Sequence, residues 1–86
     1  MRLYIGNLSY EANERDLREA FEKFGEVTGV IIIEDRFTGR SKGFGFVEMP
    51  SNEEAGRAIA GLNGREIRGR VILVNKASTN ITRPPL

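Results

Sequence analysis

The chain has 86 residues, of which 40% are hydrophobic and 29% charged, and this composition predicts one small globular domain. It contains no Cys and no His, which excludes a disulfide framework and a thiolate metal site and removes the commonest general acid or base. The net charge of +1 is weak support for a nucleic-acid partner, but basic residues gather at 36–42 and 65–76 while acidic residues gather at 11–26.

No apolar run approaches the roughly 20 residues that a membrane-spanning helix needs. The chain enters a strand-like run at once, without the layout of a signal peptide. We therefore expect a cytoplasmic protein with no membrane partner.

The first predicted element is a short strand at residues 2–6. Leu3 and Ile5 point to one face and Tyr4 to the other, because successive side chains of a strand alternate. A Gly-Asn pair ends the strand and begins a loop. Tyr4 is therefore the ring of this strand that we expect on a solvated face.

A helix is predicted next, with Asn13 as its N-cap and Asp16 three residues further on. Its apolar side chains recur at the i, i+3, i+4, i+7 spacing of one helix face, and these are Leu17, Ala20, Phe21 and Phe24. We expect this face to pack into the core and Gly25 to end the helix.

A second strand is predicted over Val27 to Asp35, where β-branched residues run without alternation. A basic, Gly-containing loop at 36–41 should join it to the next strand as an antiparallel hairpin. Phe37 in this loop has two interpretations, between which the sequence does not choose. Its ring either folds back onto the hairpin or lies at the edge of a binding surface.

The third strand, residues 42–49, has the sequence Lys-Gly-Phe-Gly-Phe-Val-Glu-Met. Alternation places Phe44 and Phe46 on one face with charged neighbours, and Val47 and Met49 on the core face. Two large rings on the wet face of a strand are unusual unless something packs on them. A flat, anionic, ring-bearing partner such as single-stranded nucleic acid suits that face. The two glycines are expected to allow close packing against a helix.

A second helix is predicted to begin with a capping box, Ser51 to Glu54. Its apolar face repeats the spacing of the first helix, with Ala55, Ala58, Ile59 and Leu62. An Arg-Gly-Arg turn then leads to a last strand over residues 71–75. No periodicity remains from residue 78, so residues 78–86 are expected to form a flexible tail.

The octamer at 42–49 resembles the longer signature of the RNA recognition motif family: Lys or Arg, Gly, aromatic, Gly or Ala, Phe, Val, any residue, aromatic. Met49 is the departure from it, and its core-facing position should affect packing more than binding. Residues 3–8, Leu-Tyr-Ile-Gly-Asn-Leu, resemble the shorter signature of the same family. By this resemblance, residues 1–77 form one RNA recognition motif domain, most like the small single-domain RNA-binding proteins of bacteria.

The predicted order of strand, helix, strand, strand, helix, strand is that of the ferredoxin-like split β-α-β fold, in the α+β class. Two helices with one apolar stripe each can cover only one face of the four-stranded antiparallel sheet. Right-handed crossovers place the first and third strands at its centre. Tyr4, Phe44 and Phe46 should therefore meet on the uncovered face.

The family resemblance implies binding of single-stranded RNA, with bases stacking on Tyr4, Phe44 and Phe46. Basic residues at and before the octamer would hold phosphates or base edges, and these are Lys42, Arg40 and Arg36. Further contacts are implied at Asn7 of the shorter signature and at the end of the last strand, Asn75 and Lys76. Such proteins act in RNA metabolism or regulation. We expect a monomer that binds RNA or, alternatively, single-stranded DNA.

An alternative is that the same face binds a protein or a second copy of the chain. Aliphatic residues should rim the rings, namely Ile31, Ile33, Val71 and Leu73, and an apolar surface of this size is typical of interaction sites. An enzyme on the same scaffold, such as a small acyl-phosphate hydrolase, would need an Arg cradle and an Asn that positions water. No cradle loop is recognisable in the sequence, so we expect no enzymatic activity and no cofactor.

Overall fold

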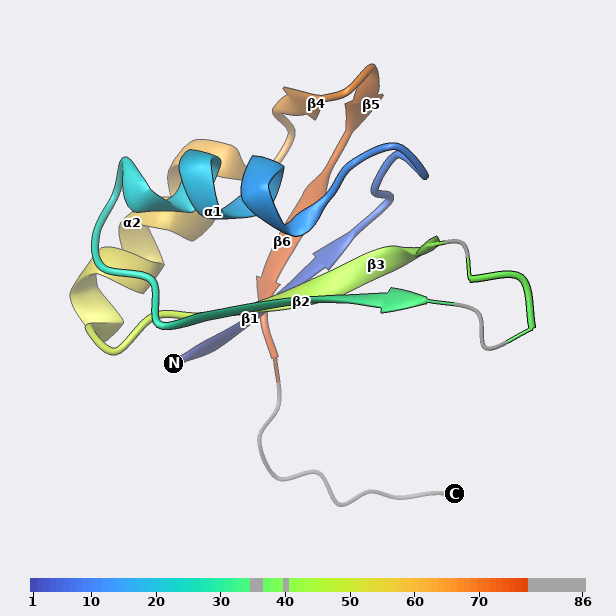
Figure 1. Cartoon of the computed structure of the whole chain (residues 1–86). Helices are drawn as coiled ribbons and strands as arrows, with labels where there is room; N and C mark the ends of the chain where they lie inside the picture. Colours follow the sequence, from blue (N-terminus) through green and yellow to red (C-terminus); the bar gives the residue numbers. More distant parts are fainter. Residues whose placement is uncertain (35–36, 40, 78–86) are drawn as a thin grey trace, which may run out of the picture.

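The computed structural model describes residues 1–34, 37–39 and 41–77, with Ser41 and Lys42 as backbone alone. Within these residues the elements are β1 (Arg2–Gly6), α1 (Glu14–Glu22), β2 (Gly29–Glu34), β3 (Ser41–Glu48), α2 (Asn52–Leu62), β4 (Glu66–Ile67), β5 (Arg70–Val71) and β6 (Leu73–Lys76). This order confirms the predicted ferredoxin-like α+β fold, with a small additional hairpin of β4 and β5 before the last strand (Figure 1).

The main sheet has the strand order β2-β3-β1-β6, and every neighbouring pair is antiparallel. β1 and β3 therefore lie at its centre, as predicted. Figure 1 shows α1 and α2 on the same side of this sheet. In the part of the chain that the structure describes, no helix lies on the other side. We refer to that side, which carries Tyr4, Phe44 and Phe46, as the open face.

The core lies between the sheet and helices α1 and α2. Leu3, Ile5 and Val47 from the central strands are fully buried, and so are Leu17 and Phe21 from α1. This confirms the predicted inward-facing sides of β1, β3 and α1. Burial of each large apolar side chain contributes about 1.5–3 kcal/mol, so this layer provides most of the hydrophobic stabilisation. Among the described residues, neither helix has the length and apolar character required to cross a membrane.

The first helix begins where predicted and ends earlier. Asn13 Oδ1 accepts a hydrogen bond from the Asp16 N–H at 2.9 Å, and Asp16 Oδ2 accepts one from the Asn13 N–H at 3.0 Å. This reciprocal pair satisfies two of the N–H groups that a helix start leaves without intrahelical partners. α1 ends at Glu22 with Lys23 as its C-cap, so the prediction that Gly25 ends the helix is wrong.

Gly25 and the start of α2 share a contact that the sequence did not indicate. Gly25 leaves room for the Glu54 side chain, which a Cβ at this position would overlap. Ser51 Oγ accepts a hydrogen bond from the Glu54 N–H at 3.2 Å, as an N-cap does. The Glu54 carboxylate, however, accepts from the Glu26 N–H at 3.1 Å. The second half of the capping-box prediction is therefore wrong, because Glu54 ties α2 to the segment after α1.

The two glycines of β3 are explained by strand conformation and strand spacing and not by close packing against a helix, contrary to the prediction. Gly43 has φ +89°, a left-handed conformation that other residues rarely adopt. At Gly45, the atoms nearest to an added Cβ belong to the backbone of Ile31 and Ile32 in β2. The register of β2 and β3 shifts beside this point, between Ile32 and Glu34. Gly45 therefore permits the close approach of β2 at this irregularity.

The predicted last strand, residues 71–75, is divided in the structure. Arg68 and Gly69 both have positive φ, 54° and 87°, as a tight two-residue hairpin turn requires, and this turn joins β4 to β5. Ile72 then donates its N–H to the Arg65 carbonyl at 2.8 Å. Ile72 thus pairs with the hairpin side, and β6 starts one residue later.

Candidate nucleic-acid interface

Three aromatic rings lie against one another on the open face, where β1 and β3 run side by side. Tyr4 lies opposite Phe46 in the register, and Phe44 precedes Phe46 by two residues. The ring centroids are 6.0 Å apart for Tyr4 and Phe44, 5.9 Å for Tyr4 and Phe46, and 6.3 Å for Phe44 and Phe46. Each ring is only half-buried. This ring cluster therefore converges as the strand order required and leaves part of each ring available to a ligand.

The rings of the cluster differ in orientation. The planes of Tyr4 and Phe44 are tilted by 33°, whereas Phe46 is turned by 64° from Tyr4 and by 90° from Phe44. Edge-to-face contacts of this kind are favourable because the positive ring edge meets the negative ring face. The cluster offers two roughly aligned ring faces and one turned ring.

Gly6 determines where the Tyr4 ring can lie. An added Cβ at Gly6 would be 2.9 Å from Cε2 and 3.0 Å from the hydroxyl oxygen of Tyr4, so the ring leans along β1 over this residue. A side chain at position 6 would displace the ring. From the sequence we expected Gly6 only to end the strand. Because it follows Tyr4 by two residues and lies on the same face, its small size could have been linked to the Tyr4 ring.

A charged pair at one end of the ring cluster was not identified from the sequence. The Arg2 guanidinium carbon lies 5.8 Å from the Phe46 ring centroid, a cation–π contact, and Arg2 Nε lies 3.4 Å from Glu48 Oε1. These residues and Ile31 on β2 border a hollow of about 200 Å³. Arg2 has the same strand parity as Tyr4, so alternation alone could have placed it on the open face.

Asn7 uses both polar ends of its side chain within the protein. Its Nδ2 donates to the Val71 carbonyl at 2.6 Å, and its Oδ1 accepts from Arg70 Nη2 at 2.6 Å. Its backbone is left-handed, with φ +56°, where the chain turns away from β1. Asn7 therefore fastens β5 to the end of β1 and holds the Arg70 guanidinium in place. Its direct contact with RNA stays a prediction.

The two predicted site residues of the last strand lie on different faces. Asn75 is exposed and lies opposite Tyr4 in the register, which places it beside the ring cluster. Lys76 is also exposed but lies opposite Leu3, whose side chain is buried on the helix side. The structure thus brings Asn75 to the rings and does not bring Lys76 there.

The predicted basic contacts lie largely beyond what the structure describes. Arg36 and Arg40 fall outside the described residues, and Lys42 is placed by its backbone near the start of β3, two residues before Phe44. Their contacts with phosphate stay predictions. Phe37 is 91% exposed, so the described part of the hairpin does not bury its ring.

Aliphatic side chains border the ring cluster. Ile31 from β2 and Leu73 from β6 are each about half exposed, and so is Val71 from β5. Ile33 is half-buried. Ile31 and Leu73 therefore form the expected aliphatic rim on the two outer strands of the four-stranded sheet, whereas Val71 belongs to the small β4–β5 sheet. The rim enlarges the apolar area beside the rings.

Comparison with known proteins identifies the family. The family model for the RNA recognition motif matches residues 3–73. The chain belongs to the RNA recognition motif family. The match includes both signature segments and extends from β1 to the first residue of β6.

Relatives of this RNA recognition motif are named as RNA-binding proteins. Glycine-rich RNA-binding protein 3, mitochondrial, of Arabidopsis thaliana is 52% identical over 90% of the chain, which spans 25% of that relative. The putative RNA-binding protein RbpE of a Nostoc species is 51% identical over 90% of the chain and 78% of its own length. RbpA of a Synechocystis species is 46% identical over 96% of the chain and 82% of its own length. These matches confirm the predicted similarity to small bacterial RNA-binding proteins.

Solved structures share the fold. RNA Binding Protein PG1 has a TM-score of 0.87 and 45% identity to the chain, with 99% of both chains covered. The SXL-lethal protein in a protein/RNA complex has a TM-score of 0.85 and 30% identity, over 92% of this chain and 47% of that one. The backbone of this RNA recognition motif is therefore similar to that of a protein in complex with RNA.

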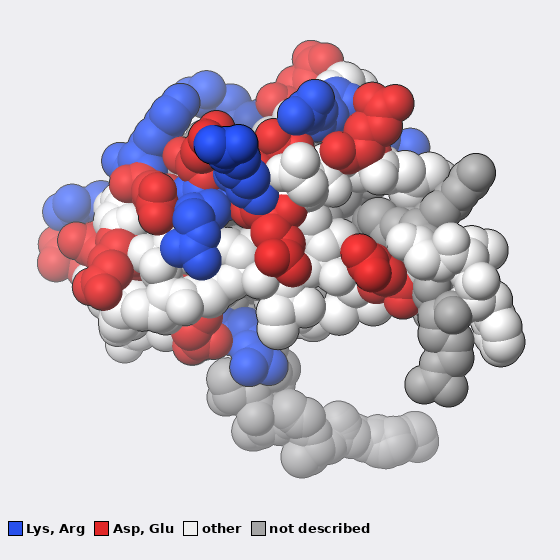
Figure 2. Space-filling model, viewed as in Figure 1, with Lys and Arg blue, Asp and Glu red and all other residues white. Residues whose placement is uncertain are grey.

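The helix layer of the RNA recognition motif carries charges of both signs. Ion pairs run along the helices: Arg15–Glu19 and Arg18–Glu22 at 3.5 Å in α1, and Arg57–Glu53 at 3.0 Å in α2. Figure 2 shows acidic and basic side chains intermixed over the helices at the upper left of the view. An intermixed surface produces no extended positive potential, so it has little attraction for a polyanion.

A bidentate ion pair joins the small hairpin to α1. Arg68 donates from Nε to Asp16 Oδ2 at 2.9 Å and from Nη2 to Asp16 Oδ1 at 3.2 Å. These hydrogen bonds, followed by the one from the Asn13 N–H, lower the pKa of Asp16 below its ordinary value of 3.8. They also raise the pKa of Arg68. Both groups are therefore charged at neutral pH, and the pair holds the β4–β5 turn against the start of α1.

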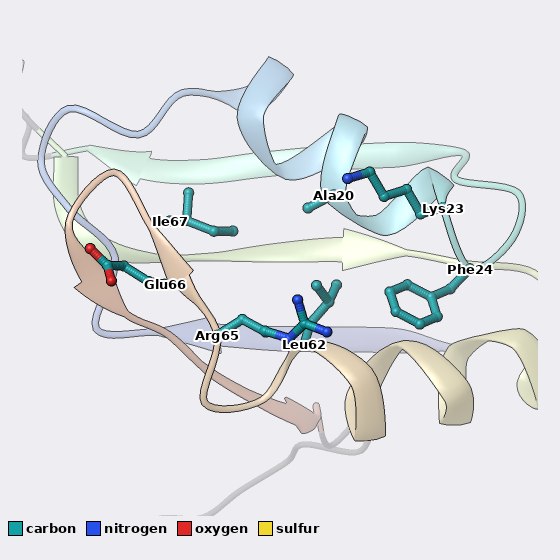
Figure 3. A pocket seen from close by; sticks show the side chains of 7 residues that line it. All are labelled: Ala20, Lys23, Phe24, Leu62, Arg65, Glu66 and Ile67. Atoms are coloured by element: carbon teal, nitrogen blue, oxygen red, sulfur yellow. The ribbon is translucent and has the colours of Figure 1, made fainter.

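A cavity of about 290 Å³ lies on the helix side, away from the ring cluster. Figure 3 shows that its lining comes from α1, the end of α2 and the small hairpin, with Ala20, Lys23, Phe24, Leu62, Arg65, Glu66 and Ile67. Its mixture of two cations, one anion and apolar side chains indicates no single ligand. Within residues 1–34, 37–39 and 41–77, no group of His, Cys, Asp or Glu side chains could hold a metal ion.

Proposed function

We propose that the chain binds single-stranded RNA on the open face of its sheet, by contact alone and without a chemical step. The observation that carries this proposal is the ring cluster, in which Tyr4, Phe44 and Phe46 lie against one another at the centre of the sheet and remain partly exposed. Membership of the RNA recognition motif family supports RNA as the partner. The names of the relatives support it as well.

In this proposal, bases stack on the ring cluster. Stacking on an aromatic side chain contributes about 1–3 kcal/mol per base and tolerates any base, because every base has a π-face. Tyr4 and Phe44 suit two consecutive bases, since their planes differ by 33°. Phe46 is turned by 90° from Phe44, so it suits a sugar or a base that has changed direction.

Polar groups around the rings hold the remainder of each nucleotide. Asn75 lies beside Tyr4, where its amide can both donate to and accept from a base edge. Arg2 brings a positive charge over Phe46. Phosphate contacts are assigned to the basic residues that precede Phe44 along the chain, namely Lys42, Arg40 and Arg36. Asn7 acts through Arg70, which it positions.

Other parts of the proposal concern the protein beyond its binding face. We assign residues 1–77 to one RNA recognition motif domain; the tail predicted at residues 78–86 lies outside the described residues. We further infer a monomer in a cytoplasmic location that acts in RNA metabolism or regulation.

Lys76 would reach the RNA only if the RNA strand passed around the outer edge of β6. RNA is preferred to single-stranded DNA where 2′-hydroxyl groups are contacted.

Protein binding by the same face is the second candidate, and the aliphatic rim is the observation that favours it. Ile31 lies opposite Phe46 and Leu73 opposite Gly6 in the register, and both present exposed apolar area. Self-association through this area would appear as a dimer in sedimentation at high concentration. A monomer under those conditions counts against self-association.

Fluorescence anisotropy of a labelled, random-sequence pool of single-stranded RNA tests the proposal at two salt concentrations. The wild-type chain should bind with a modest negative dependence on salt. Phe44→Ala/Phe46→Ala should lose about 2–6 kcal/mol of binding free energy, the sum for two stacking positions. Glu53→Ala/Arg57→Ala removes an exposed ion pair on α2 without changing the net charge, and this control should bind as the wild type does. Unchanged binding by the ring variant would contradict the proposal.

A further inference from the structure

The loop between β1 and α1 carries an exposed ring that lies outside the ring cluster. The loop is anchored, because Leu8 donates its N–H to the Gly43 carbonyl at 2.8 Å and Ala12 donates to the Ser9 carbonyl at 3.0 Å. Leu8, Ser9 and Ala12 are buried, whereas Tyr10 is 67% exposed. A fixed backbone thus holds a large ring in solvent, where the ring gains little stabilisation from folding.

The Arg70 side chain lies beside this loop, and a hydrogen bond to Asn7 orients its guanidinium group. Its Nη2 donates to Asn7 Oδ1 at 2.6 Å, while Asn7 Nδ2 donates to the Val71 carbonyl at 2.6 Å. A guanidinium carries five N–H donors, so the bond to Asn7 orients the group and leaves donors for a phosphate or a base edge. The loss of side-chain freedom on binding is correspondingly small.

A hollow of about 220 Å³ lies between these side chains. Its lining consists of Asn7, Leu8, Tyr10, Gly43 and Arg70. Gly43 keeps the hollow open, because an added Cβ would lie 3.7 Å from Tyr10 Cε1 and the φ of +89° disfavours other residues. Among these five lining residues, Arg70 alone carries a formal charge. The hollow therefore suits a group that is planar and anionic.

The hollow lies one residue along β3 from the ring cluster, although no ring of the cluster lines it. Gly43 directly precedes Phe44, whose ring lies 6.0 Å from that of Tyr4. An RNA strand that passes over Phe44 toward this end of β3 would approach the hollow that Tyr10 lines. A second possible partner is a protein, because Tyr and Arg are also enriched in protein–protein interfaces. The continuity with the rings favours RNA.

We propose that Tyr10 and Arg70 form a further nucleotide subsite, in which an unpaired base stacks on Tyr10 while Arg70 contacts its phosphate or base edge. The inference rests on the proposed function, since it extends the RNA path beyond the ring cluster. Unpaired bases are commonly recognised by stacking on aromatic side chains and guanidinium groups. The subsite accepts any base, because it contacts a π-face and an anion.

A fluorescent side chain at position 10 reports on stacking directly. The chain contains no Trp, so Tyr10→Trp introduces a single Trp, whose emission can be excited separately from that of the remaining Tyr4. A random-sequence single-stranded RNA of about twelve nucleotides should quench its emission, with the same affinity as measured by anisotropy. Ala60→Trp on the exposed side of α2 is the matched control and should not be quenched. Unquenched emission of Tyr10→Trp at saturating RNA overturns the subsite.

Affinity measurements separate this inference from the proposed function. With the same RNA, Tyr10→Ala should bind about five-fold more weakly or worse, the lower bound for one stacked base, and Tyr10→Phe should bind as the wild type does. The thermal midpoint should not change, because the ring is exposed. Wild-type affinity of Tyr10→Ala, together with weakened binding by Phe44→Ala/Phe46→Ala, overturns the subsite alone. Absence of RNA binding by the wild-type chain overturns both.

Discussion

The two faces of β1 and β3 carry large apolar side chains in different surroundings. On the helix side, Leu3 and Val47 are fully buried. On the open face, Tyr4 and Phe46 occupy the neighbouring positions of the same strands and are only half-buried. Strand alternation thus divides one segment into residues that stabilise the fold and residues that are available to a ligand. Substitutions on the helix side should change the free energy of unfolding, and those on the open face should change RNA affinity.

Replacing a buried ring should give the largest effect. Phe21→Ala empties a fully buried position and should lower the free energy of unfolding by about 3–5 kcal/mol. Phe44→Ala removes the same atoms from a half-buried ring and should cost clearly less. Chemical denaturation followed by circular dichroism measures both values. Equal losses from the two variants would contradict the division between the faces.

A glycine substitution sharpens the comparison on the open face. Gly6→Ala places a Cβ where the Tyr4 ring lies, so the ring must move. RNA affinity should fall by about 1 kcal/mol, the lower end for one stacked base. The free energy of unfolding should change little, because the displaced atoms form the end of a movable side chain. Gly56→Ala has open space around it. It should keep wild-type affinity and stabilise α2 by up to about 1 kcal/mol.

A charge in the aliphatic rim distinguishes the two candidate functions. Leu73→Arg should leave RNA affinity unchanged or raise it, and one added phosphate contact would steepen the salt dependence by about one unit. If the face binds protein instead, the buried charge should abolish that interaction. Anisotropy at several salt concentrations and sedimentation measure these outcomes. A weakened RNA complex would mean that Leu73 itself contacts the nucleotide chain.

The smallest expected effect concerns the ion pair of Asp16 and Arg68 on the helix side. The pKa of Asp16 is lower in the folded chain than its ordinary value of 3.8, so the ionised carboxylate stabilises the fold above that pH. This contribution should be lost as the pH falls through the lowered pKa. Asp16→Asn keeps an oxygen for the Asn13 N–H and should be slightly less stable than the wild type at neutral pH.

The difference between Asp16→Asn and the wild type should shrink as the pH falls through the lowered pKa of Asp16, because protonation leaves a neutral side chain at position 16 in both chains. Denaturation midpoints across this range measure the difference. A gap that persists at low pH would show that the substitution acts through something other than the charge of Asp16. RNA affinity at neutral pH should be unaffected.

The sequence predicts the parts of the fold that depend on local periodicity. The apolar stripe of α1 and the alternation in β1 and β3 both follow from side-chain spacing, and the structure has them on the expected sides. The convergence of Tyr4 with Phe44 and Phe46 is predictable for the same reason, once the strand order is known. Asn13 is predictable as a cap because its partner is three residues away.

The remaining features depend on contacts between distant segments. The Glu54 carboxylate bonds to a backbone group 28 positions away, so its capping role could not be assigned from Ser51 alone. Arg70 is positioned by Asn7, 63 residues earlier, and a turn sequence contains no sign of this. Tyr10 stands in a loop without periodicity, so no pattern in the sequence indicates that its ring is exposed while Ser9 and Ala12 are buried. Arg2 was the exception, since strand parity was sufficient to place it.

A titration of the chain with single-stranded RNA, followed by amide chemical shifts in NMR, tests the central claim most directly. The account predicts that the largest shifts occur in β1 and β3, around Tyr4, Phe44 and Phe46, while the amides of α1 and α2 change little. Large shifts around the helix-side cavity, with unchanged signals in β1 and β3, would contradict it.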